Sequence, residues 1–343
     1  MTISSASPPA AGIATDPALA TDPPLATDPA LAADTGLELL LEWRRAHLQQ
    51  GLRERIRVLR RPPQSSGPDA RAADRDHVHQ LRTGLRRLRS MAEAFPHHWR
   101  GPSAKSLRRL ASAAGGVRDL DVLLEALHEQ RRSLAGREHK RLKRLIKRLE
   151  TSRAQGRRQL SKRLNNLPGP LLSGPPQPAL HADPASSPSA LHHAALPLLR
   201  AGLIRQLAVL RLHPGWGHGK RPRPGSRQER QQHELRKAFK RFRYQLELLE
   251  ALEPDLRDRL LLLKGTQDSL GQLQDLVIWR SLLKRHLKGR FRRELPELAA
   301  RWRRQADAAR STWMELRRQW LEPATGLEAW QRWLLELEIP AGQ

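Results

Sequence analysis

Residues 79–89 read HQLRTGLRRLR and residues 233–244 read HELRKAFKRFRY, so one basic pattern occurs twice in the chain. In both copies a histidine is followed by a cation three, seven and ten positions later. At 3.6 residues per turn these four positions lie within about 80° of one another on a helix. The apolar residues of both copies form a separate stripe roughly 120° away, as is typical of a helix that buries one face. Each stretch therefore predicts an amphipathic helix that carries a row of positive charge, here called a basic stripe.

A second feature recurs after each basic stripe. Asp119 follows His79 by 40 residues, Asp275 follows His233 by 42, and in both copies a glycine stands four positions before the aspartate. A glycine and then an aspartate predict the end of one helix and the capped start of the next. Recurrence in the same order at this distance indicates an internal duplication of a large unit rather than a short-period repeat.

Two glutamates also correspond between the copies. Glu93 stands four residues after Arg89, and Glu247 stands four residues after Arg243. Opposite charges four positions apart are neighbours on a helix, so we expect each glutamate to pair with its arginine.

The charge of the chain restricts its partners. The formal net charge is +27, although residues 1–36 contain four Asp and no Lys or Arg. An excess of this size repels itself and attracts polyanions, whether nucleic acid, polyphosphate or an anionic surface. Nine Trp, four Phe and one Tyr provide few platforms on which bases of single-stranded nucleic acid would stack.

Composition excludes several classes of site. The chain has no cysteine, which rules out disulfides and thiolate metal sites. It has no apolar run long enough to span a bilayer, and no basic segment followed by an apolar core at its start. We therefore expect a cytoplasmic protein without membrane insertion.

The chain divides into a tail and a helical region. Residues 1–36 repeat Thr-Asp-Pro and predict a disordered tail. From residue 37 the apolar pattern has the helical period and shows no sustained alternation, which predicts an all-α fold. Residues 166–188 are rich in Pro, Gly and Ser and predict a linker between halves at 37–165 and 189–337. Within the two halves, the pattern predicts separate helices over residues 103–113, 119–133, 228–253, 255–270 and 273–287.

These stretches resemble the CHAD proteins, whose name abbreviates conserved histidine α-helical domain. The resemblance rests on residues 79–89, 118–122, 233–244 and 270–276 and extends from about residue 37 to 337. It implies two similar bundles of about four main helices each, around a basic cavity that binds inorganic polyphosphate. It also implies association with polyphosphate granules.

The two basic stripes supply the candidate binding residues. Arginine suits phosphate because its planar fork donates two hydrogen bonds, and lysine supplies a mobile point charge. Each histidine either contacts the ligand, with added charge when protonated near its usual pKa of about 6.5, or is a structural residue bonded to a carboxylate. The candidate residues are His79, Arg82, Arg86, Arg87, Arg89, His233, Arg236, Lys237, Lys240, Arg241, Arg243 and Tyr244, with Asp119 and Asp275 as structural support that caps helices or orients the cations.

Other functions have less support in the sequence. A nucleic-acid-binding protein would share the charge, but no nucleic-acid motif is present. A phosphohydrolase would need a cluster of metal-binding carboxylates, and Asp119 and Asp121 are two positions apart, so they point apart on a helix. No nucleophile motif occurs either. We therefore expect a non-enzymatic protein that needs no metal and no cofactor, while its oligomeric state and its preferred polyphosphate length stay open.

Overall fold

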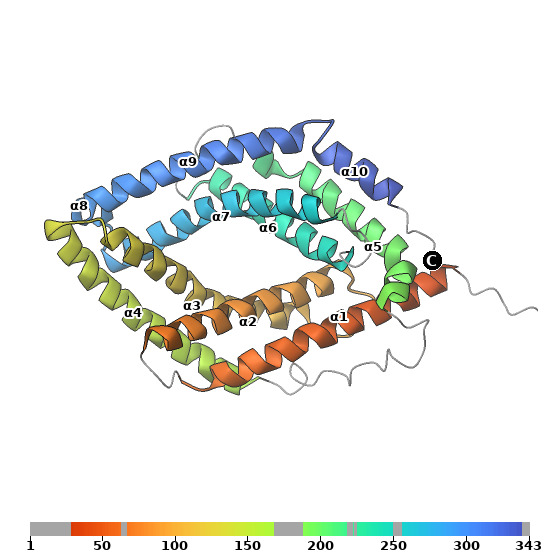
Figure 1. Ribbon diagram of the computed structural model, residues 1–343, viewed down its shortest axis with the longest axis horizontal. Coiled ribbons are helices and arrows are strands. Elements are labelled where there is room, and N and C mark those ends of the chain that lie inside the picture. Colours follow the sequence, from red (N-terminus) through yellow and green to blue (C-terminus); the bar gives the residue numbers. More distant parts are fainter. Residues whose placement is uncertain are drawn as a thin grey trace, which may run out of the picture.

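The protein is all α-helical. The computed structural model describes residues 29–62, 67–167, 188–217, 222, 225–249 and 256–337. These ranges contain ten α-helices, two short 3-10 helices and no strand (Figure 1), which confirms the fold class expected from the hydrophobic period.

The helices form two groups. The first group comprises α1 (Pro29–Arg60), α2 (Pro68–Ala94), α3 (Ala104–Arg131) and α4 (Gly136–Asn165). The second comprises α5 (Pro188–Arg211), η3 (Pro214–Trp216), α6 (Arg227–Leu246), η4 (Glu247–Leu249), α7 (Leu256–His286), α8 (Phe291–Glu294), α9 (Pro296–Leu321) and α10 (Leu327–Glu336). In Figure 1, α2 and α3 face α6 and α7 across the middle of the molecule, while α1, α4 and α9 lie outside them.

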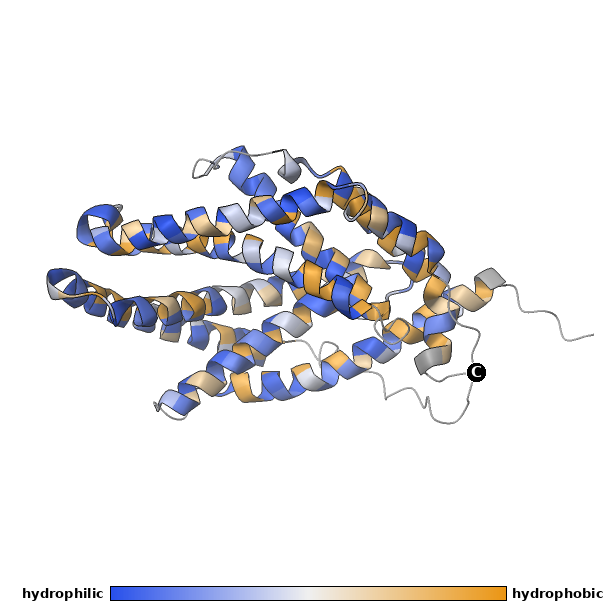
Figure 2. Ribbon diagram, turned by 45° about the horizontal axis from the view of Figure 1, so that its top comes forward, coloured by the Kyte–Doolittle hydropathy of each residue, from blue (hydrophilic) through white to orange (hydrophobic). Residues whose placement is uncertain are grey.

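The two groups share their hydrophobic cores. One core joins residues of α1, α2 and α3, such as Leu85, to residues of α5, α6 and α9, such as Phe242 and Trp313. A second core joins Leu123 of α3 to Leu283 of α7 at the other end of the molecule. Figure 2 shows hydrophobic and hydrophilic positions alternating along most helices, as expected for helices that bury one face. Because both cores take side chains from both groups, neither group packs by itself.

The first helix begins earlier than the sequence predicted. It starts at Pro29, so the expected tail boundary at residue 36 is wrong for residues 29–36, and residues 1–28 lie outside the described chain. Ala33 and Leu37 are buried, and Gly36 lies so close to Ala194 of α5 that a side chain would clash. Packing against α5 thus holds this turn in the helix. Most of the expected linker, residues 168–187, also lies outside the described chain.

The predicted breaks at Gly115 and Gly271 are wrong. Each glycine lies inside a continuous helix, α3 or α7, and so do Asp119 and Asp275, which therefore cap no helix. A glycine inside a helix costs only about 1 kcal/mol relative to alanine, which packing of the rest of the helix offsets. The helix expected at 228–253 also ends early, because α6 stops at Leu246 and continues as η4.

A buried network of ion pairs fixes α4 against α1, α2 and α3. Asp74 of α2 accepts a hydrogen bond from Arg157 Nε at 2.9 Å. It also forms an ion pair with Arg153 Nη2 at 2.7 Å. Arg153 Nε also pairs with Asp121 at 2.8 Å. Arg157, only 1% exposed, donates to two carbonyl oxygens at the end of α1, at 2.8 and 3.1 Å. Charges this deeply buried need such partners, so the network determines how these four helices meet.

Candidate functional site

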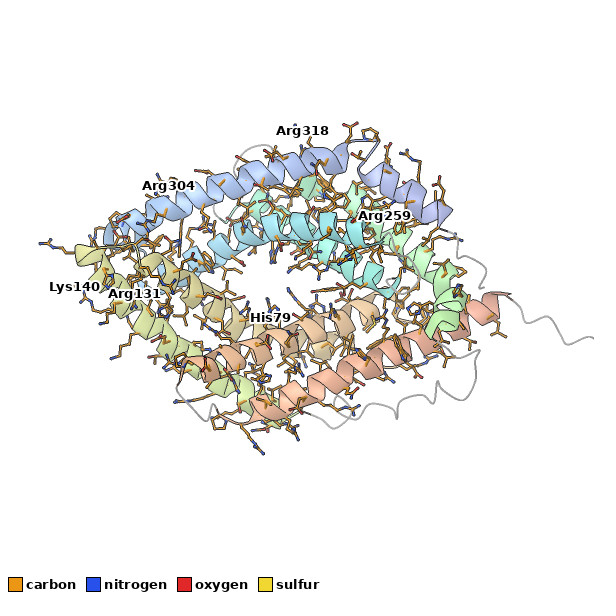
Figure 3. The ribbon with its side chains drawn as sticks, in the orientation of Figure 1. His79, Arg131, Lys140, Arg259, Arg304 and Arg318 are labelled. Carbon is orange, nitrogen blue, oxygen red and sulfur yellow. The ribbon has the colours of Figure 1, made fainter. Side chains whose placement is uncertain are left out.

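A cavity of about 590 Å³ lies between the two groups of helices. Side chains of α2 and α3 line one side of it, and side chains of α6 and α7 line the other. Figure 3 shows His79 on the side of α2 that faces the middle of the molecule. Residues of both basic stripes therefore line one cavity, of the kind that the family resemblance implied.

Local sequence places the two stripe helices. Pro68 occupies the first turn of α2, where its missing N–H costs nothing, and Pro96 follows the end of that helix. The α6 helix begins after Ser226, whose hydroxyl accepts a hydrogen bond from the Glu229 backbone N–H at 3.2 Å. Glu229 in turn accepts one from the Gly225 backbone N–H at 2.8 Å. These signals fix where each stripe starts along its helix.

Most of the predicted binding residues line the cavity. Those from α2 and α3 are His79, Arg82, Arg86 and Asp119, and those from α6 and α7 are Arg236, Lys240, Arg243, Tyr244 and Asp275. The cavity therefore has five arginine and lysine side chains from the predicted stripes and two carboxylates from the predicted supporting residues.

Three of the predicted arginines form ion pairs with glutamates. The expected pairs are confirmed: Arg89 lies 3.3 Å from Glu93, and Arg243 lies 2.9 Å from Glu247. Glu247 also pairs at 3.0 Å with Arg87 of α2, so one carboxylate holds the two stripe helices together. Arg87 and Arg89 lie outside the cavity lining, whereas Arg243 lines the cavity and pairs with Glu247 as well.

The other predicted residues outside the lining belong to α6. Lys237 pairs with Glu234 on the same helix at 2.7 Å, and Arg241 is likewise absent from the lining. His233 lies beside a separate, much smaller space of about 70 Å³, and its side chain hydrogen-bonds to Gln274 of α7. The α6 stripe thus reaches the cavity only beyond its first residue, because His233 lies against α7.

The cations of the two stripes act on one another. Burial and the adjacent Arg82 lower the pKa of Arg86 to about 10. Burial, followed by Arg236, Arg86 and Arg82, lowers the pKa of Lys240 to about 6. Because α2 residues perturb an α6 residue, the positive charges of both helices meet in one poorly solvated space. Burial and the neighbouring cations thus favour the uncharged form of the Lys240 amine.

The two aspartates lie among these cations. Burial raises the pKa of both Asp119 and Asp275, against the opposing effect of Arg82 on the first and Arg236 on the second. Arg82 Nη2 lies 3.8 Å from Asp119. The aspartates thus neutralise part of the positive charge and orient the arginines, one of the two roles that the sequence allowed for them.

The glycines before these aspartates lie beneath stripe arginines. A Cβ at Gly115 would lie 3.3 Å from Arg82 Nε, which is tighter than most contacts, whereas a Cβ at Gly271 would lie 3.7 Å from Arg236 Nη2, an ordinary van der Waals distance. Each guanidinium therefore lies over the backbone of the facing helix. The recurrence that suggested a helix break in fact marks the place where a stripe arginine crosses α3 or α7.

The histidine of the first stripe is uncharged at neutral pH. Burial and then Arg118 lower the pKa of His79 below its usual value of 6.5. An imidazole in this state donates a hydrogen bond through one nitrogen and accepts one through the other. The expected protonation near pH 6.5 is therefore shifted to more acidic pH in the empty cavity.

Arg118 is a cavity cation that the sequence prediction missed. It lines the cavity beside His79, yet the corresponding position in the second copy is Gln274. It lies outside both basic stripes, although it stands directly before Asp119 in the stretch that carries the family resemblance. Gln267 and Gln272 of α7 also line the cavity, and no sequence pattern marks them.

The described part of the chain holds neither a metal-binding cluster nor a membrane-spanning helix. Across the residues that the structure describes, no group of three or more His, Asp or Glu side chains is arranged to hold a metal ion. None of the helices in this part of the chain is long and apolar enough to cross a bilayer.

These features define an all-α protein with a cationic cavity between two groups of helices. The family model for the CHAD domain matches residues 50–284, more than half of the chain, and the protein belongs to the CHAD domain family. The solved CHAD domain from the plant Ricinus communis is 22% identical, with 90% of this chain and 93% of that chain covered and a TM-score of 0.45. PptA from Streptomyces chartreusis is 17% identical, with 82% and 98% covered and a TM-score of 0.44. Among curated proteins, none matches the chain.

Proposed function

We propose that this protein binds inorganic polyphosphate in the cavity between α2 and α6 and does not hydrolyse it. The observation that carries the proposal is the convergence of Arg82, Arg86, Arg236 and Lys240 on one poorly solvated space, where burial and the neighbouring cations lower the pKa of Arg86, Arg236 and Lys240. Like charges held together in this way repel one another, and a polyanion bound among them would offset that repulsion. The family resemblance points to the same ligand.

The chemistry of the lining favours phosphate over bases. Arginine forks match phosphate oxygens with two hydrogen bonds each, and His79 and Tyr244 add single donors. The aromatic side chains in the lining are limited to Tyr244 and Trp279, alongside the His79 ring. A nucleic acid would lose most of its base stacking in such a site. Nucleic-acid binding is therefore the second candidate, supported by net charge alone.

Competition between polymers tests this function. We expect long-chain polyphosphate to displace duplex DNA and single-stranded RNA of matched phosphate concentration at physiological salt, measured by fluorescence anisotropy. The logarithm of affinity should fall linearly with the logarithm of salt concentration, since counterions are released. Equal or tighter binding of DNA would contradict the proposal.

Incubation of polyphosphate with the protein and Mg²⁺, Mn²⁺ or Zn²⁺ should leave the polyphosphate length unchanged. Release of phosphate that depends on Asp119 or Asp275 would instead indicate an enzyme.

Binding should also take up a proton. The pKa of Lys240 is about 6, and a polyanion beside the amine should raise it towards its usual value of about 10.4. At pH 8, binding of polyphosphate should therefore be coupled to the uptake of about one proton from solution, and affinity should fall as pH rises from 6 to 10. Calorimetry in two buffers of different ionisation enthalpy measures the uptake. Lys240→Gln should abolish it, and uptake that persists in this variant would contradict the assignment.

We further propose that this binding recruits the protein to polyphosphate granules. A tagged protein in a cell that accumulates polyphosphate should colocalise with the granules, and the cavity variants described below should not.

A further inference from the structure

A second basic hollow lies away from the cavity. It has a volume of about 1010 Å³ and lies between residues 141–151 of α4 and the end of α7 with α8. It is called the α4–α8 groove here. Its arginines and lysine are Arg141, Arg144, Lys147 and Arg148 of α4 together with Arg290 and Arg293, and His286 lies beside them. These residues belong to no repeated pattern, and none lines the cavity between α2 and α6.

The groove is short of negative charge. Its one carboxylate, Glu294, pairs with Arg290 at 3.2 Å. Among the described residues, no carboxylate lies within ion-pair distance of Arg144, Lys147, Arg148 or Arg293. Burial, then Arg148 and Arg285, lower the pKa of His286, so cations of α4 act across the groove on α7.

Fixed contacts hold the two sides of the groove in place. Glu138, at the start of α4, accepts hydrogen bonds from the backbone N–H groups of Glu297 and Leu298 at 3.1 and 2.9 Å. Arg141 donates to the Glu294 carbonyl oxygen at 3.3 Å. A preformed site loses less entropy on binding than one that must be ordered. The groove is therefore a concave surface whose two sides are held in place by these hydrogen bonds.

An outward-facing helix surface provides the contrast. Arg303, Arg304 and Arg318 are exposed on α9, and Figure 3 shows Arg304 and Arg318 on the side away from the middle of the molecule. Single-helix cations of this kind are an ordinary solvated surface. The cations of the α4–α8 groove differ because three elements direct them to one space.

The groove and the cavity are neighbours along α7. Asp275 lines the cavity and His286 lines the groove, eleven residues further on. At 1.5 Å per residue this separation is about 16 Å. A flexible polymer longer than that distance can contact both sites at once, and linked contacts strengthen each other through effective concentration.

We propose that the α4–α8 groove is a second binding site for a linear phosphate polymer, so that long polyphosphate occupies the cavity and the groove together while a short one occupies the cavity alone. This inference rests on the proposed function of the cavity. Arginine and lysine without carboxylate partners suit phosphate oxygens, and the absence of any aromatic side chain from the groove lining argues against base recognition.

Two matched triple variants of the full chain test the inference. The groove variant is Arg144→Gln, Lys147→Gln and Arg148→Gln, and the control is Arg303→Gln, Arg304→Gln and Arg318→Gln. All six side chains are exposed, and each variant removes the same charge from one helix. The probes are tripolyphosphate, long-chain polyphosphate and duplex DNA, with circular dichroism to verify folding.

We expect the groove variant to lose about 10- to 100-fold in affinity for long-chain polyphosphate and to bind tripolyphosphate as the wild type does. The control variant should bind both nearly normally. Equal losses in the two variants would mean that only net charge matters, and a larger loss for DNA than for polyphosphate would mark the groove as a nucleic-acid surface; either result overturns the inference. If wild-type protein binds neither polyphosphate, the cavity proposal fails. If the wild type binds both and the groove variant is unaffected, only the second site is wrong.

Discussion

An Arg86→Ala variant should bind polyphosphate about 10- to 150-fold more weakly than the wild type, because one charged hydrogen bond contributes roughly 1.5–3 kcal/mol. Arg86 lies on the α2 side of the cavity, and Lys240 occupies the matching stripe position on the α6 side. If one polymer contacts both sides, Lys240→Ala should weaken binding in the same way. Glutamate at either position should be worse than alanine, since it adds repulsion.

Salt dependence separates lost contacts from misfolding. The slope of log affinity against log salt should fall by about one unit for each phosphate contact that a variant loses. Isothermal titration at several salt concentrations measures it. Arg87→Ala is the matched control, because Arg87 is adjacent in sequence but pairs with Glu247 outside the cavity. The shared-site model is wrong if one of the two cavity variants binds normally while the other loses all binding with an unchanged circular dichroism spectrum.

An Asp74→Ala variant should lower the free energy of unfolding by about 3–5 kcal/mol, which is typical when one partner of a buried ion pair is removed. The change leaves Arg157 buried without its carboxylate, and Arg153 keeps only Asp121. Urea denaturation followed by circular dichroism measures the loss.

A neighbouring aspartate serves as the control for this stability effect. Asp76 is exposed on the same helix and accepts one long hydrogen bond from Gln80 at 3.4 Å. Its replacement by alanine removes the same charge and should change stability by no more than about 0.5 kcal/mol. A cost below about 1 kcal/mol for Asp74→Ala would show that the buried network does not stabilise the packing of α4 against α2.

The sequence located the site better than it located the helix boundaries. Both basic stripes were predicted from spacing alone, and seven of their twelve residues line the cavity. The failures have one cause. Spacing gives the angle of a residue around its helix, but the packing of other elements decides whether that residue reaches the cavity, as α7 does at His233 and as Glu247 does at Arg87.

The sequence by itself determined the all-α class, the two basic stripes and the ion pairs within each stripe helix. These follow from local periodicity and charge, which every segment carries without its neighbours. Only the tertiary structure decided that Gly115 and Gly271 lie within helices beneath arginines, that the pKa of Lys240 is lowered to about 6 and that α4 and α8 enclose a second groove. Burial and proximity between distant segments produce those features, because desolvation and repulsion depend on which side chains share a space rather than on their order in the chain.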